Sequence, residues 1–212
     1  MVAPKAPVPR ASGIYGLFNF DDQPLDPRGL QALGLPRGAG EEASWKVAGH
    51  DPFMPDAVSR HDEGGASTLL AGFIEDHSDL ASRLGLHPAL SAAGLARAAL
   101  ERFGSNAPAE MTGEWSLLHR ATDGTLTLMV SAGVRDPIFY AVSGRRVAVA
   151  PDLFALARLD WVDSRIDEAG LLFPVARAAL RARWNGARPI SRRAGGGRRS
   201  ATVSSSTTTR TR

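Results

Sequence analysis

The sequence predicts an α+β fold, a layered αββα-type sandwich of antiparallel sheets with helices packed outside. Residues 113–150 alternate between short apolar runs and turn formers, as expected of two consecutive hairpins. Residues 75–104, just before them, have the apolar spacing of two helices. Strands, then helices, then paired hairpins favour antiparallel sheets over a doubly wound parallel sheet.

The first third of the chain predicts three strands separated by loops. Residues 12–20 and 68–74 are apolar runs between turn formers, and residues 44–48 repeat this pattern more weakly. Residues 21–40 hold three prolines and four glycines, which indicates a loop with one short helical turn. The polar residues 51–65 are also expected to form a loop.

Two helices are predicted next, each with a recognisable end. The first begins near residue 75 and ends at Gly85, and the second begins after the N-cap residue Ser91 and stops at Gly104. Asp123-Gly124 separates two strand-like runs, which predicts a hairpin with a type I′ turn. A second hairpin is expected over residues 137–150, followed by a short helix over residues 152–158.

Composition excludes several classes of protein. Of the 212 residues, 43% are hydrophobic and 22% are charged, as in ordinary globular proteins, so wholesale disorder is not expected. The absence of cysteine excludes a disulfide framework, a cysteine zinc site and a thiol nucleophile, and it fits a cytoplasmic protein. The sequence contains no apolar run of about 18 residues, as a membrane-spanning helix would need. The N-terminus has no apolar segment typical of a signal peptide.

The two ends of the chain differ from its middle. We expect residues 1–11 to be a disordered lead-in, residues 12–160 to be the domain, and residues 161–185 to be a helical remnant of a connection to a further domain. Residues 186–212 are basic and of low complexity, which predicts disorder. Nine arginines and no acidic residue lie from Arg181 onward, whereas the preceding part has an excess of acidic groups. We hypothesise that residues from about Ala178 onward are a frameshifted or prematurely ended reading of a longer gene.

Several segments, in order along the chain, carry a resemblance to a known family. They are Ser12–Gly16, Ala71–Asp76, Ala96–Gly104, Met111–Leu117, Pro137–Tyr140 and Val147–Asp152 with Ala155-Leu156. Together they resemble the N-terminal class-II glutamine amidotransferase domain of asparagine synthetases, which has an N-terminal-nucleophile fold. Ser12–Gly16 is similar to that family's opening Cys-Gly-Ile-x-Gly. Ala71–Asp76 is similar to its Asn-Gly-Glu-Ile-Tyr-Asn.

The resemblance also shows where this chain departs from the family's chemistry. In the family an N-terminal cysteine attacks glutamine with its own α-amine as base, and backbone N–H groups with an Asn amide stabilise the oxyanion. Here Ser12 stands at the nucleophile position with eleven residues before it, and Ala71, followed by Gly72, stands at the oxyanion Asn position. Ala92 replaces the carboxylate that would bind the substrate amine. The family's Arg-Gly-Pro-Asp element is not found. Arg60-His61-Asp62 lies near the place in the sequence where it would be expected.

These departures resemble a subgroup of the family. The β-lactam synthetases and lasso-peptide cyclases keep a glutaminase-like domain without the cysteine and use ATP to activate a substrate carboxylate. The resemblance therefore implies a domain, cut off before its synthetase domain, of an amide-forming ligase that takes a small molecule or a peptide. The Ser-Gly-Gly-x-Asp-Ser loop that would cradle ATP is missing, and Gly195–Gly197 lacks the following Asp-Ser. We thus expect no cofactor in this chain, with ATP and Mg²⁺ belonging to a synthetase domain or subunit.

Alternatives from other classes remain open. The chain could be a glutamine-hydrolysing asparagine synthetase subunit, a serine-nucleophile enzyme after processing at Ser12, or a binding or regulatory module with a basic arm. Nucleic-acid binding by the arm is disfavoured because no aromatic residue follows Trp184. Four further features are expected to have structural roles. His61-Asp62-Glu63 is expected in a solvated loop, Asp21-Asp22 in a turn, and Trp115 and Phe139-Tyr140 in the core. No metal site is expected.

Overall fold

The computed structural model describes residues 11–36, 43–51, 57–132 and 137–163. The predicted lead-in up to residue 10, most of the helical remnant, the basic tail and Gly195–Gly197 lie outside these residues. In the described part no helix is long and apolar enough to cross a membrane.

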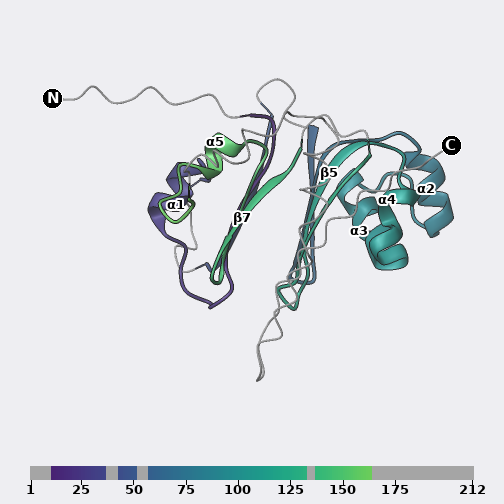
Figure 1. Cartoon of the computed structure of the whole chain (residues 1–212). Helices are drawn as coiled ribbons and strands as arrows, with labels where there is room; N and C mark the ends of the chain where they lie inside the picture. The colour runs from purple at the N-terminus through teal and green to yellow at the C-terminus, as the bar shows by residue number, and fades with distance from the viewer. Residues whose placement is uncertain (1–10, 37–42, 52–56, 133–136, 164–212) are drawn as a thin grey trace.

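Two four-stranded antiparallel sheets face each other, as the sequence predicts (Figure 1). The first sheet has the strand order β2-β1-β8-β7, and the second has the order β3-β4-β5-β6. The strands are β1 (Gly13–Asn19), β2 (Trp45–His50), β3 (Val58–Glu63), β4 (Ala66–Ile74), β5 (Gly113–Arg120), β6 (Leu126–Val130), β7 (Phe139–Ser143) and β8 (Arg146–Ala150). The predicted αββα-type layering is therefore confirmed.

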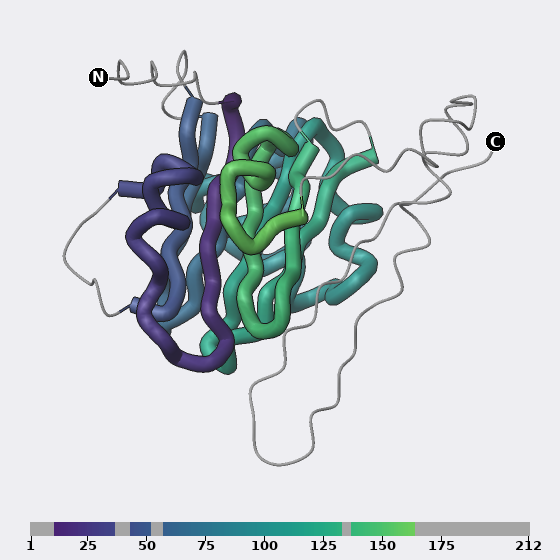
Figure 2. Tube along the Cα trace, turned by 60° about the vertical axis from the view of Figure 1, so that its left-hand side comes forward, coloured from purple at the N-terminus to yellow at the C-terminus, as the bar shows by residue number. Residues whose placement is uncertain are grey.

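Helices cover the outer face of each sheet (Figures 1 and 2). The first sheet is covered by α1 (Pro27–Ala32) and α5 (Leu153–Leu156), where Leu30 and Leu156 pack with Tyr15 and Leu17 of β1. The second sheet is covered by α2 (His77–Leu84), α3 (Ala92–Phe103) and α4 (Ala107–Glu110). A third apolar cluster fills the space between the sheets, because alternate residues of each strand point to opposite faces.

The predicted helix ends agree with the structure. Ser91 is the N-cap of α3, where its hydroxyl accepts a hydrogen bond from the Gly94 N–H at 3.2 Å. Gly85 ends α2 in the left-handed conformation, with φ 69°. The helical turn expected within residues 21–40 is α1, which begins with the N-cap Asp26 and Pro27.

Two local predictions were wrong. Residues 58–63, expected to be loop, form the edge strand β3. Edge strands commonly carry charged residues, so this segment lacks the apolar pattern by which a strand is recognised. The hairpin between β5 and β6 is confirmed, but its turn is not type I′, since Asp123 has no positive φ and only Gly124 does, at 87°. The Ala121 N–H instead bonds the Thr125 carbonyl at 2.9 Å, and the Asp123 carboxylate accepts from the Thr125 N–H at 2.8 Å.

Candidate functional site

Ser12 immediately precedes β1, at the end of the sandwich where β2 finishes. Gly13 pairs with His50, so Ser12 lies beside Asp51. The Ser12 hydroxyl donates a hydrogen bond to Asp51 Oδ2 at 2.6 Å, and both residues are half-buried. This short, charge-assisted bond fixes the direction of the hydroxyl.

The backbone nitrogen of Ser12 belongs to an internal peptide bond. The carbonyl of that bond, on Ala11, accepts a hydrogen bond from the Tyr15 hydroxyl at 2.9 Å. Tyr15 is 2% exposed and sits in the core cluster of the first sheet, so the chain is anchored on the N-terminal side of Ser12. In this uncleaved chain the residue has no free α-amine to act as a base.

Ala71 lies at the same end of the sandwich as Ser12. It pairs with Val58, which contacts Gly49, and Gly49 in turn pairs with Ile14 of β1. Ile14 and Ala71 also share the apolar cluster between the sheets, where Ala71 is 7% exposed. A methyl group at this place has no hydrogen-bond donor with which to stabilise an oxyanion.

Gly72 is required by the backbone. Its φ is +100°, and a Cβ added there would lie 2.1 Å from the carbonyl oxygen of Glu114 on the neighbouring strand. Glycine is the residue that tolerates both conditions. The sequence placed Gly72 at a pocket position by resemblance, and the structure adds a steric reason for a glycine there.

Ala92 is the first residue of α3, on the outer face of the second sheet. The neighbouring Ala93 N–H bonds the Ser59 hydroxyl of β3 at 3.1 Å, and the Gly94 N–H bonds Ser91. Two amides of the helix start are therefore occupied by hydroxyl groups of the chain itself. No carboxylate is contributed by Ala92, so the position has no charge with which to hold a substrate amine.

The remaining candidate residues lie in the core, against the core or in a turn. Trp115 is 1% exposed, and its indole N–H donates to the Met111 carbonyl at 3.3 Å, which confirms it as core. Asp21 and Asp22 form the turn after β1, as predicted. Phe139 and Tyr140 pack partly buried against two different core clusters.

The predicted solvated loop around His61 is wrong, since His61, Asp62 and Glu63 belong to β3. The side chains of Asp62 and Glu63 are more than half exposed, and Asp62 pairs with Arg60 at 2.7 Å. Across the described ranges, no group of three His, Asp or Glu side chains could hold a metal ion.

Asp51 is the site residue that sequence reasoning missed. It lies in a polar segment taken as loop, and no local pattern distinguishes it from neighbouring acids. Its role depends on the antiparallel pairing of β1 with β2, which brings together residues 39 positions apart. Only the register of that pair could have identified it.

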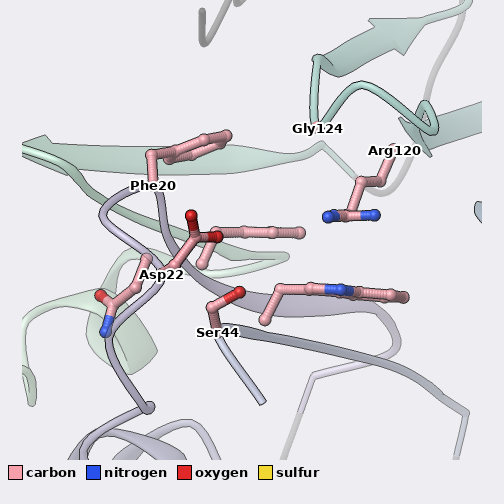
Figure 3. Close-up of a pocket in the computed structure, with 8 residues that line it drawn as sticks. Phe20, Asp22, Ser44, Arg120 and Gly124 are labelled. Carbon is pink, nitrogen blue, oxygen red and sulfur yellow. The ribbon is translucent and has the colours of Figure 1, made fainter. Parts of the chain in front are cut away.

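A shallow pocket opens at the opposite end of β1 (Figure 3). Arg120 lies over the Trp45 ring at 4.4 Å from its centroid, and the Phe18 and Phe20 rings stack at 6.4 Å. Because it surrounds the last residues of β1, this pocket is separate from Ser12.

The hydrogen bond from Ser12 to Asp51 predicts a measurable contribution to stability. We expect Ser12→Ala to lower the free energy of unfolding by about 0.5–1.5 kcal/mol, since it removes a half-buried bond to a carboxylate. Thr125→Val removes an exposed hydroxyl–carboxylate bond of 3.0 Å and should cost under about 0.5 kcal/mol. Urea denaturation of both variants compares them, and equal costs would contradict a structural role for the Ser12 bond.

Comparison with known proteins finds similarity to solved structures only. No protein-family model matches the chain, and no curated protein matches it significantly. Among solved structures, it is similar to glutamine phosphoribosylpyrophosphate amidotransferase from B. subtilis complexed with ADP and GMP, with a TM-score of 0.47 and 14% identity. The match covers 68% of this chain and 43% of that one, so the chain spans less than half of the amidotransferase.

Proposed function

We propose that this chain is a glutaminase-like domain that does not hydrolyse glutamine and that belongs to an ATP-dependent, amide-forming ligase. Its role is to pack against the ligase's synthetase domain and to help shape the substrate site there. The replaced cysteine and the missing amine-binding carboxylate support placing it with the lasso-peptide and β-lactam cyclases. One observation carries the proposal: Ser12, at the family's nucleophile position, has its nitrogen in a peptide bond whose Ala11 carbonyl is held by the buried Tyr15 hydroxyl.

Amide hydrolysis at this place would need a nucleophile, a base and an oxyanion donor. The Ser12 nitrogen is an amide in the uncleaved chain, and Ala71 has no donor at the oxyanion position. Loss of one oxyanion donor alone typically costs about 3–4 kcal/mol of barrier. Loss of several catalytic groups together is therefore expected to abolish glutaminase chemistry.

Exposed apolar side chains at the Ser12 end support a packing role. Phe73, at the end of β4, is 51% exposed, and Leu153 and Phe154, which follow β8, are 54% and 79% exposed. Gly13 lies against Pro151, which places α5 beside the start of β1, as in Figure 1. Large exposed apolar side chains at this end of both sheets fit a surface that another domain covers.

The packing role is tested with a partner that carries the ATP site. A neighbouring reading frame encoding Ser-Gly-Gly-x-Asp-Ser would be co-expressed with this chain, and complex formation measured by size-exclusion chromatography. Phe154→Glu is expected to weaken the complex at least about tenfold, because it places a charge in an apolar contact.

Val142→Glu is the matched control. Val142 is also exposed, at 43%, but it lies in the β7–β8 hairpin at the opposite end. It should leave the complex unchanged. Equal effects of the two substitutions, or no complex with the wild-type chain, would refute this packing surface.

The hydrogen bond to Asp51 also favours a second candidate function. A hydroxyl directed by a carboxylate is the feature expected of a serine nucleophile, provided that the chain is cleaved before Ser12. Intact mass spectrometry of the purified chain separates the two functions, since our proposal predicts that residues 1–11 are retained.

A further inference from the structure

A row of polar side chains crosses the outer face of the second sheet beneath α3. His61, Thr68 and His119 occupy paired positions on β3, β4 and β5, and Thr127 continues the row on β6. Thr68 is 0% exposed and His119 is 7% exposed, on the face of the sheet that also carries the apolar Leu70, Leu117 and Met129. None of these residues takes part in the site around Ser12.

Hydrogen bonds and contacts connect the residues of the row to one another and to α3. Thr68 Oγ1 and His119 Nδ1 form a buried hydrogen bond of 2.9 Å. A Cβ at Gly94 of α3 would lie 3.1 Å from His61 Nδ1, so the helix backbone rests on that ring. Arg97 of α3 bonds Glu63 of β3 at 2.5 Å and Glu101 of its own helix at 2.8 Å.

The charges around His119 favour its neutral form. Burial lowers the pKa of His119 below its ordinary value, and the positive charge of Arg97 acts in the same direction. Glu101 on α3 and Asp123 in the β5–β6 loop oppose this effect. From β3 the charged and titratable groups are His61 and Glu63, while β4 and β6 contribute the uncharged Thr68 and Thr127.

We propose that this row is an acid-sensitive latch, in which proton uptake by His119 loosens the packing of α3 on the second sheet. A protonated His119, only 7% exposed, would place a second positive charge beside Arg97 with little water to solvate it. The inference is independent of the proposed ligase function, because its test requires no activity.

The sign of the pH effect follows from linkage. Since the folded-state pKa of His119 is below that of the unfolded chain, the unfolded state binds more protons in the window between the two values. The contribution to stability is full above the ordinary histidine pKa and is lost as the pH falls from there toward the lowered value. Opening of α3 is expected within that window.

Hydrogen exchange of the full chain tests the latch. The protection of α3 amides, corrected for intrinsic exchange and divided by that of β5, is compared between pH 7.5 and 5.5. We expect this ratio to fall by a factor on the order of ten in the wild-type chain. His119→Gln, which cannot titrate but can still bond Thr68, should remove most of the fall.

His87→Gln is the matched control, because His87 is exposed and outside the row. It should keep the full wild-type response. A ratio that is independent of pH in the wild-type chain, or a response retained in His119→Gln, would overturn the proposal.

An NMR titration of the wild-type chain keeps the proposal testable if His119→Gln does not fold. The α3 amide shifts should move with the same midpoint as the His119 ring signal. Midpoints that follow a different histidine would also overturn the latch.

Discussion

Replacing Gly72 with alanine is expected to destabilise the fold by about 3–5 kcal/mol. The backbone φ of +100° strains any L-residue, and a Cβ would lie 2.1 Å from the Glu114 carbonyl oxygen and 3.1 Å from Trp115 Cα. These atoms are backbone of β5, which pairs with β4 over eight positions, from Ser67 to Ile74. They cannot move away without breaking the central pair of the second sheet.

Gly64→Ala is the matched control for this prediction. Its φ of +58° is also positive, but no atom of the described residues lies within 4 Å of an added Cβ. It should therefore cost only about 1 kcal/mol, the strain of the conformation alone. Urea denaturation measures both, and a difference below about 1 kcal/mol would show that β5 does not restrict position 72.

Truncating Trp115 to alanine is expected to lower the free energy of unfolding by about 3–5 kcal/mol. The side chain is 1% exposed and packs in the cluster that joins β5 to the helices of the second sheet. The truncation would leave a cavity and remove the partner of the Met111 carbonyl.

Trp45→Ala provides the comparison with a tryptophan at the edge of the fold. Trp45 is half-buried, with Arg120 over its ring, so its loss should cost about 1–2 kcal/mol. Thermal and urea unfolding of the two variants would be compared. Equal losses would contradict the assignment of Trp115 to the core.

The parts of the fold that were predictable are those with local causes. Ser91 and Gly85 mark helix ends because their own side chain or conformation satisfies the terminal backbone groups. The apolar runs that became β1, β4, β5 and β8 are buried strands, so their composition identified them. The layered arrangement followed from the order of these elements.

The parts that were missed depend on partners distant in sequence. β3 has a polar sequence and is a strand because it completes the edge of the second sheet beside β4. Asp51 acquires its role by facing Ser12 across a strand pair. The turn at Asp123 was misjudged because an Asp-Gly pair is compatible with more than one hairpin loop.

The candidate site was predictable only as a set of positions. Resemblance selected Ser12, Ala71 and Gly72, and the structure brings them to one end of the sandwich. Ala92 lies on the outer face of the second sheet. Nothing in the sequence indicates its position relative to the other three residues. The chemistry expected of the site rests on the residue types themselves, and above all on the missing thiol.

Ammonia release from glutamine would show whether the Ser12 site hydrolyses carboxamides. The purified full chain would be incubated with glutamine and ammonia followed by an enzyme-coupled assay, with Ser12→Ala in parallel. We expect both proteins to match the blank without protein, because the uncleaved chain has neither a thiol nor a free amine at the start of β1. Ammonia release by the wild-type chain that disappears in Ser12→Ala would contradict it.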